Sequence, residues 1–370
     1  MIRAFQSKVG TLTSDRKEIQ DIILKHFNLI DRSINPDLSV MEEILDTITP
    51  RVTRNMNEVL MQPFSPEKVK HALDQMCHYK SPGLDDNVLV AYELNHYLAH
   101  KRWGSVDHVA LKLNISKAYD RVEWIFLERV LLRLGFHCVF VKLILICVSS
   151  VSYSIMLEGE PFGFIRPERG LHQVDPLSPY LFLFCVEAFS CMVQKEEHEG
   201  SIQGVAVCRR APRLSHLLFA DDTLLFYQAT LEAIDCIKGI LTKFERASDL
   251  KINLQKSAMV FSKNTDHNLK EALARRLGVE LLDKHEKYMG LPTVSGCSKR
   301  ELFVSLKNRV WSKLQIWGAM RLSEAGWMVL IKAVAQAIPT YAMGCFLLPD
   351  GLLHELDSML ANFFWQHDER

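Results

Sequence analysis

Two adjacent aspartates, Asp221 and Asp222, lie between two apolar runs in the stretch HLLFADDTLLFYQA, residues 216–229. Two carboxylates this close repel each other and raise each other's pKa unless a cation holds them. The flanking runs predict a β-hairpin with the acids at its tight turn. Carboxylates at strand ends suit Mg²⁺, a hard cation that takes oxygen ligands. The pair therefore indicates either two-metal phosphoryl transfer, which needs acids from more than one strand, or a solvated turn.

A second strand is predicted at residues 109–115, in the stretch HVALKLNISKAYDRVEW, where Lys112 and Asn114 are the polar members of an alternating pattern. A helix is expected to follow it and to end at Gly135. The next helix is expected to begin at Asp175, because Asp followed by Pro176 is typical of a helix start. Asp175 is accordingly interpreted as a cap and not as a further metal ligand.

The bulk composition predicts a soluble, globular protein of two or three packed units, since the chain has 370 residues, 48% of them hydrophobic. Lys plus Arg and Asp plus Glu each number 44, so only a local basic patch could bind nucleic acid through charge. The nine cysteines lack zinc-site spacing and are expected to be reduced thiols. The N-terminus lacks an apolar signal core, and the uncharged run at 143–157 is too short to span a membrane. No membrane partner is expected.

The clearest basic patch lies at residues 298–340, in two predicted helices, the second of which is expected to stop before Pro339. One interpretation is a solvated helix face with Trp311 and Trp317 in the core. The other is a nucleic-acid-binding surface formed by Lys299, Arg300, Lys307, Arg309 and Lys313.

Four segments, in order, resemble motifs A to D of reverse transcriptases from plant LINE-type (non-LTR) retrotransposons: LKLNISKAYDRVEW, RGLHQVDPLSPYLFLF, LLFADDTLLF and LKINLQKSAMVFS. The resemblance implies an α+β right-hand polymerase, with an RRM-like antiparallel palm sheet, fingers and a helical thumb. It assigns residues 1–85 to a helical pre-fingers segment, 86–107 to a remnant fingers helix, 108–262 to the palm and 263–370 to a helical thumb or connection region. It implies DNA synthesis from deoxynucleoside triphosphates on an RNA template and DNA primer, with Mg²⁺ or, as a substitute, Mn²⁺. It also implies a nuclear or cytoplasmic location.

The resemblance carries roles to individual positions of this chain. Asp221 and Asp222 fall on the motif C metal ligands. Tyr119 falls on the aromatic residue that screens the sugar 2′-position, and Gln173 falls on the motif B glutamine near template and nucleotide. Lys256 falls on the motif D lysine, which could donate a proton to the leaving pyrophosphate.

Two motifs depart from the family pattern. Asn114 stands where motif A places its metal-binding aspartate, and an amide brings no negative charge. Asp120, six residues on, is expected to lie already in a helix and so not to replace it. In motif B, His172 stands in place of an arginine and Val174 in place of a glycine, which matters if that glycine adopts a positive φ or allows close backbone approach.

A third departure is that most of the fingers segment is missing, with a seam near Asp85 and Asp86. Together the departures predict a copy with little or no polymerase activity. The alternative is a non-catalytic remnant that binds nucleic acid, and a metal-dependent nuclease would need further acids that the sequence does not nominate.

Overall fold

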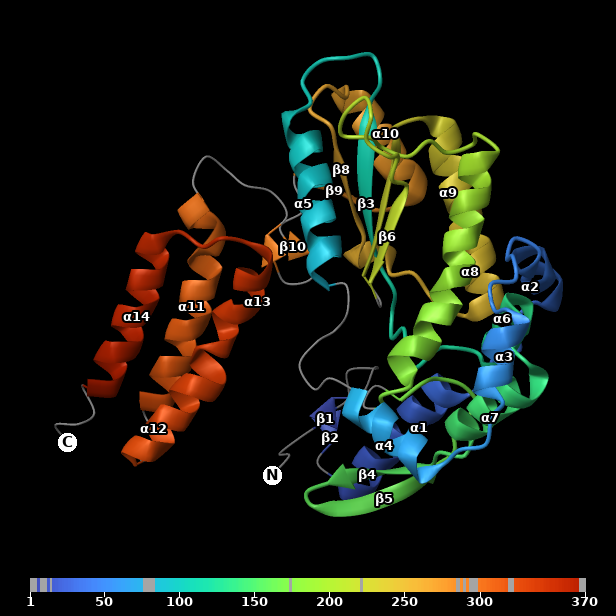
Figure 1. Ribbon diagram of the computed structural model, residues 1–370, viewed down its shortest axis with the longest axis horizontal. Helices are drawn as coiled ribbons and strands as arrows, with labels where there is room; N and C mark the ends of the chain where they lie inside the picture. Colours follow the sequence, from blue (N-terminus) through green and yellow to red (C-terminus); the bar gives the residue numbers. More distant parts are fainter. Residues whose placement is uncertain are drawn as a thin grey trace.

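The computed structural model describes residues 5–6, 12–13, 15–75, 84–172, 175–219, 222–283, 287–288, 291–292, 299–318 and 323–365. Within them the chain combines helices with a mostly antiparallel sheet, so the predicted α+β class is confirmed (Figure 1). The central sheet has the strand order β6-β7-β3-β8-β9. Its strands are β6 (His216–Phe219), β7 (Asp222–Gln228), β3 (His108–Asn114), β8 (Ala258–Phe261) and β9 (Glu280–Leu281). Only the β8–β9 pair is parallel.

One face of this sheet is covered by helices that lie on the same side in Figure 1: α6 (Trp124–Leu134), α8 (Ser178–His198) and α9 (Leu231–Ser248). The alternate residues Leu111 and Leu113 of β3 and Leu225 and Tyr227 of β7 point into this core. Such alternation is what a strand buried on one face requires. α2 (Leu38–Leu45) and α10 (His267–Leu277) pack against α9. The expected C-cap at Gly135 is confirmed, because its φ of 99° ends α6 in the left-handed conformation.

The other face of the sheet carries α5 (Leu84–His100). Three side chains of one helix face, Ala91, Leu94 and Leu98, pack with Leu224 and Phe226 of β7. They recur at the spacing of one helix stripe. α5 thereby lies between the sheet and the C-terminal helices (Figure 1).

The C-terminal helices form a bundle with its own core: α11 (Lys299–Gly318), α12 (Glu324–Leu330), the π-helical turn η2 (Ile331–Ala335), α13 (Ala337–Cys345) and α14 (Asp350–Trp365). The predicted stop before Pro339 is wrong. α13 begins at Ala337, so Pro339 lies in its first turn. The N–H groups of a first turn make no intrahelical hydrogen bond, so a proline, which has no N–H, is tolerated there. By length and composition alone, the run Glu324–Cys345 could cross a membrane, but Trp327 and Ile331 are buried in the bundle core.

Trp311 is exposed (52%), whereas Trp317 is buried, so only one of the two tryptophans predicted for the core is there. The reason is helical geometry. Phe303, Leu306, Val310, Leu314 and Trp317 form the buried stripe of α11, and Trp311 lies one residue, about 100° around the helix, beyond it.

The remaining elements lie mainly near the end of the sheet at which β3 ends, the end of Asn114 (Figure 1). They comprise α1 (Arg16–Asp31), α3 (Arg54–Leu60), α4 (Pro66–Gln75), α7 (Cys138–Ser149) and the hairpin of β4 (Tyr153–Leu157) with β5 (Glu160–Ile165). The structure also contains two short antiparallel pairs of strands. They are β1 (Phe5–Gln6) with β2 (Leu12–Thr13), and β10 (Lys287–Tyr288) with β11 (Leu291–Pro292). No disulfide bond joins the cysteines among the described residues.

Candidate functional site

The register of the central sheet brings the motif A position and the motif C hairpin together. β6 and β7 are antiparallel, with Phe219 opposite Asp222, which agrees with the predicted hairpin. β3 pairs with β7 so that Asn114 is directly opposite Asp222. Opposed residues of an antiparallel pair place their side chains on the same face, about 5 Å apart at Cβ. Asp221 lies outside the described residues.

A third side chain, Lys112, belongs to this group, and the sequence reasoning did not assign it a role. Lys112 precedes Asn114 by two residues and therefore lies on the same face of β3. Its Nζ is 3.7 Å from Oδ1 of Asp222, and the two side chains are 24% and 27% exposed. The polar alternation of Lys112 and Asn114 in the strand was the signal that could have nominated it.

The backbone of Asn114 is hydrogen-bonded to the two residues that flank a short 3₁₀ turn, η1 (Leu254–Lys256), just before β8. The Asn253 N–H donates to the Asn114 carbonyl at 2.8 Å, and the Asn114 N–H donates to Ser257 Oγ at 3.2 Å. These bonds bring the turn that carries Lys256 beside the motif A position. The side chain of Lys256 is exposed.

Tyr119 and Asp120 lie in the turn 116–121 that follows β3, so the expected helical position of Asp120 is wrong. The physical reason is that the turn pairs with the segment before motif B. The Leu171 N–H donates to the Tyr119 carbonyl, and the Gly170 N–H donates to the Val122 carbonyl, both at 2.8 Å. These carbonyls are therefore engaged outside any helix, and α6 begins only at Trp124. The Tyr119 ring stacks on Phe182 of α8 at a centroid distance of 5.0 Å.

Gly170 is required at this junction. Its φ is 93°, and a Cβ there would lie 2.8 Å from the Asp120 carbonyl oxygen. A side chain would therefore push the motif B segment away from the motif A turn. The expected helix start at Asp175 is also shifted, since α8 begins at Ser178, while Asp175 accepts a hydrogen bond from the Leu177 N–H at 2.9 Å.

Next to this junction is a buried ion network around Arg169. The Arg169 guanidinium bonds to Glu123 at 3.2 Å and to Asp249, and all three side chains are at most 2% exposed. Asp249 also pairs with Arg121 at 2.9 Å and Lys251 at 3.4 Å. It caps α9 with a left-handed φ of 55°. The network joins the start of α6, the segment before α8 and the end of α9.

Arg169 also lines a cavity of about 250 Å³. Its lining includes Asp31, Asp120, Tyr153 and His172, with the Tyr153 and His172 rings edge to face at 5.6 Å. Burial, with the nearby Asp120 carboxylate, raises the pKa of Asp31, which hydrogen-bonds the Tyr153 hydroxyl. His172 is thus close to two carboxylates. The other motif B positions, Gln173 and Val174, lie outside the described residues.

The donor set of the described residues fits Mg²⁺ poorly. Around Asp222 it offers one carboxylate and the amide of Asn114, with an ammonium group close by. In the described part of the chain, no three His, Cys, Asp or Glu side chains gather closely enough to hold a metal ion. The sequence adds Asp221, but an amide at position 114 supplies no charge to offset a divalent cation.

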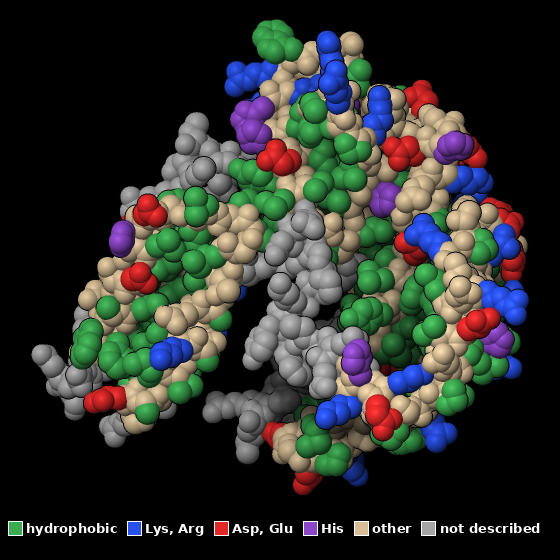
Figure 2. Space-filling view, viewed as in Figure 1, with side chains coloured by type: hydrophobic (Ala, Val, Ile, Leu, Met, Phe, Trp, Pro, Cys, Tyr) green, Lys and Arg blue, Asp and Glu red, His purple; other side chains and the backbone are tan. Residues whose placement is uncertain are grey.

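The predicted basic surface of α11 is only partly available. Lys307 forms an ion pair with Glu355 of α14 at 2.8 Å. Arg309 and Lys313 are exposed on one side of α11, and Trp311 is exposed about 160° around the helix from them. Lys299 and Arg300 begin α11, and their side chains are not among those described. Figure 2 shows Lys and Arg scattered among acidic side chains on the face it presents.

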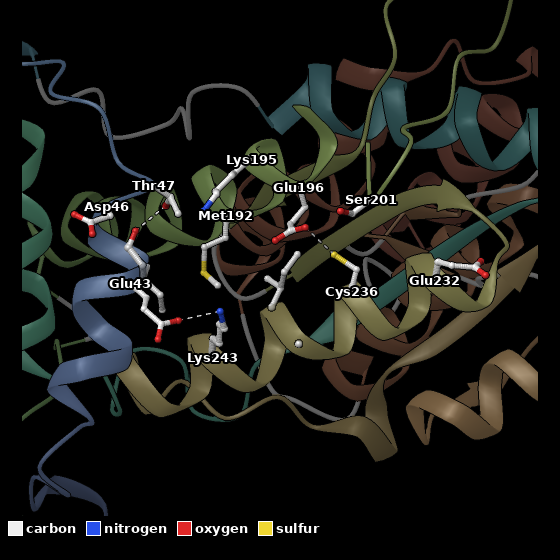
Figure 3. Close-up of a pocket in the computed structure, with 13 residues that line it drawn as sticks. Glu43, Asp46, Thr47, Met192, Lys195, Glu196, Ser201, Glu232, Cys236 and Lys243 are labelled. Carbon is white, nitrogen blue, oxygen red and sulfur yellow. Dashed lines mark hydrogen bonds and ion pairs between the residues drawn. The ribbon is translucent and has the colours of Figure 1, made fainter. Parts of the chain in front are cut away.

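A larger cavity, of about 670 Å³, lies behind the sheet between α2, α8 and α9 (Figure 3). Lys243 pairs there with Glu43 at 2.9 Å, and the Cys236 thiol donates to Glu196 at 3.3 Å. Burial and the Glu196 carboxylate raise the pKa of Cys236 to about 12. The thiol is therefore protonated at neutral pH and a poor nucleophile. This cavity is formed by helices of the opposite face from Asn114 and Asp222.

Comparison of the sequence with known proteins identifies the family to which this chain belongs. The family model described as reverse transcriptase (RNA-dependent DNA polymerase) matches residues 47–292. The chain is 47% identical over 68 residues to the uncharacterized mitochondrial protein AtMg01250 of Arabidopsis thaliana, covering 18% of this chain and 56% of that protein. It is 23% identical over 307 residues to the transposon TX1 uncharacterized 149 kDa protein of Xenopus laevis, covering 80% of this chain and 23% of that protein.

A third relative is the Pol polyprotein from the type-1 retrotransposable element R2 of Popillia japonica, 24% identical over 45% of this chain and 26% of that protein. Among solved structures, apo telomerase of Candida tropicalis truncated from its C-terminal domain matches with a TM-score of 0.36 and 12% identity. That match covers 69% of this chain and 46% of the telomerase chain.

The chain therefore belongs to the reverse transcriptase family. Its relatives include two proteins named as products of transposable elements, and its four motifs resemble those of non-LTR retrotransposon reverse transcriptases. It spans about half or less of the length of these curated relatives.

Proposed function

We propose that this chain is an impaired copy of an RNA-directed DNA polymerase, in which the two-metal nucleotidyl-transfer site has lost one of its carboxylates. The sheet β6-β7-β3-β8-β9 would be the palm, and the bundle α11–α14 the thumb or connection region. RNA template, DNA primer and deoxynucleoside triphosphates would be its partners, and Mg²⁺ its cofactor.

The observation that carries the proposal is the pairing of Asn114 with Asp222 across β3 and β7. That register supports the proposal that position 114 is the metal-ligand position of a second strand. When bound, the metal would supply activation of the attacking oxygen and stabilisation of the leaving one. Asp221 and Asp222 would hold it, while Asn114 contributes only a neutral oxygen. Losing a carboxylate that stabilises the transition state by about 4 kcal/mol would reduce the rate by about 1,000-fold.

The missing fingers segment supports the same conclusion. The seam lies at the N-terminal end of α5, and Asn87, one residue beyond the seam, donates from its side chain to the Leu218 carbonyl of β6 at 3.3 Å. The lost segment would therefore rejoin the chain beside the motif C hairpin. Without it, a nucleotide triphosphate would lose contacts that position it for reaction.

Primer extension on an RNA template with Mg²⁺ or Mn²⁺ tests the proposal. The unmodified chain is expected to give no more product than Asp222→Asn, which serves as the inactive control. Asn114→Asp restores the third carboxylate but not the fingers, so we expect only slight recovery. Robust synthesis by the unmodified chain that disappears in Asp222→Asn would overturn the proposal.

We infer, as a second candidate function, binding of single-stranded nucleic acid by α11 without catalysis. The observation that favours it is the exposed pair Arg309 and Lys313, which are four residues apart and therefore lie on one side of α11. Such cations contact phosphates, and the exposed Trp311 ring, about 160° around the helix from them, offers a separate surface on which a base can stack. Lys307 contributes less in this candidate because Glu355 already pairs with it.

RNA affinity measured across salt concentrations tests this second candidate. Trp311→Ala is expected to weaken binding by about 1–3 kcal/mol through lost stacking, and Arg309→Glu to lower the salt dependence. Lys243→Glu, on the far side of the sheet, is the matched charge control. Binding that is absent, independent of salt or equally weakened by Lys243→Glu would exclude a site on α11.

A further inference from the structure

We infer that Lys112 is the resident counter-cation of Asp222 and limits the affinity of this site for divalent metal ions. This deepens the proposed function and rests on it in one respect, namely that the motif C acids are the metal site. The inference concerns a residue to which neither motif A nor motif C assigns a role. Its basis is geometric: the ammonium lies 3.7 Å from the Asp222 carboxylate.

Lys112 is well placed for this role by the sheet itself. Asn114 is opposite Asp222, and Lys112 is two residues earlier on the same face of β3. On the same face of the sheet, Lys112 is itself opposite Leu224 of β7, which is fully buried. The stem of Lys112 therefore runs over apolar surface while its charged end reaches diagonally to the carboxylate.

The charge balance of the site explains why the lysine matters in this chain. With an aspartate at position 114, three carboxylates and one ammonium would sum to −2, which attracts a divalent ion. With Asn114, the two aspartates and Lys112 sum to −1. A divalent cation at Asp222 would also be repelled by the Lys112 ammonium, which lies 3.7 Å from Asp222 Oδ1 in a partly buried setting where screening by water is incomplete.

Binding of Mn²⁺ to the full chain, followed by the electron paramagnetic resonance signal of the free ion, tests the inference directly. Lys112→Met keeps the length of the stem and removes the charge, and it is expected to tighten Mn²⁺ binding about tenfold or more. The tightening should vanish when Lys112→Met is combined with Asp222→Asn, because the carboxylate that the lysine neutralises is gone.

Lys263→Met is the matched control. Lys263 is exposed just after β8, at the opposite end of the sheet from Asn114. Its loss should leave the Mn²⁺ dissociation constant unchanged. Lys112→Gln, which keeps a polar end group, provides a second neutral variant if Lys112→Met does not fold by circular dichroism.

Unchanged or weaker Mn²⁺ binding in a folded neutral variant would overturn the inference. Tightening that persists without the Asp222 carboxylate would also overturn it, because the lysine would then act elsewhere. Primer extension separates this result from the proposed function. Full polymerase activity of the unmodified chain would refute the proposed impairment, whereas an unaltered Mn²⁺ affinity in Lys112→Met would refute only the role of Lys112.

Discussion

At the scale of single residues, Asn114 has two separable roles. Its backbone N–H and carbonyl bond to Ser257 and Asn253, and neither bond involves its side chain. The position is therefore held by the backbone whichever side chain it carries. An aspartate would add charge to the site without removing a structural contact, and this makes Asn114→Asp an informative variant for both metal binding and activity.

The opposite end of β3 carries a histidine that should make stability depend on pH. His108 is buried, and Lys101 donates to its Nδ1 at 2.6 Å. Burial, together with the charges of Lys101 and Arg213, lowers the pKa of His108 to about 4 from 6.5. The unfolded chain binds a proton between these values while the folded chain does not. Stability is thus complete above pH 6.5 and decreases as the pH falls to about 4, by about 3 kcal/mol.

Urea unfolding at several pH values measures this dependence. The free energy of unfolding of the unmodified chain should rise between pH 4 and 6.5 more steeply than that of His108→Gln, which cannot titrate. Equal slopes for the two proteins would show that His108 is protonated in the folded state as readily as in the unfolded one.

At the scale of elements, Arg169 connects segments that are far apart in sequence. It bonds to Glu123 before α6 and to Asp249 after α9, and its Nε donates to the Ile30 carbonyl at the end of α1 at 2.7 Å. Without Arg169, the buried Glu123 carboxylate would lose its cationic partner, whereas Asp249 would keep Arg121 and Lys251. Arg169→Met should therefore lower the free energy of unfolding by about 3–5 kcal/mol.

Denaturant unfolding tests this expectation, with the free energy of unfolding of Arg169→Met compared with that of a separate control variant, Arg209→Met. Arg209 is exposed in a loop, and its replacement should change stability by less than about 0.5 kcal/mol. If the two variants lose similar stability, the buried network contributes little beyond an ordinary surface arginine.

The sequence predicted those elements whose local pattern is unambiguous. The alternation of residues 109–115 gave β3, and Gly135 marked the end of α6. The turn of Asp120 could not be predicted, because its cause is pairing with residues 170 and 171, some fifty positions away. Trp311 was predicted to lie in the core with Trp317, but it lies one position beyond the buried stripe of α11. Lys112 was seen as polar, but its partner depends on strand register.

At the scale of the whole molecule, α5 contributes to two cores at once. Leu94 and Leu98 pack on the sheet, while Val88 is buried among the C-terminal helices, and the Tyr92 ring meets Phe346 edge to face at 5.3 Å. α5 therefore joins the sheet to the bundle. Its contacts with both cores hold the C-terminal bundle against the sheet.

Val88 provides a test of this connection. Val88→Asp would place a carboxylate in the apolar contact between α5 and the bundle, at a cost of about 3 kcal/mol or more. The residues of α5 that pack on the sheet, Ala91, Leu94 and Leu98, lie farther along the helix toward its C-terminal end, so the sheet core should persist. We expect the bundle to detach and residues 299–365 to become more sensitive to limited proteolysis, while fragments containing the sheet survive. Val90→Asp is the matched control, because Val90 is 40% exposed on the same helix. The digestion pattern of Val90→Asp should match that of the unmodified chain. Equal protection of the bundle in both variants would mean that contacts other than those of α5 hold it in place.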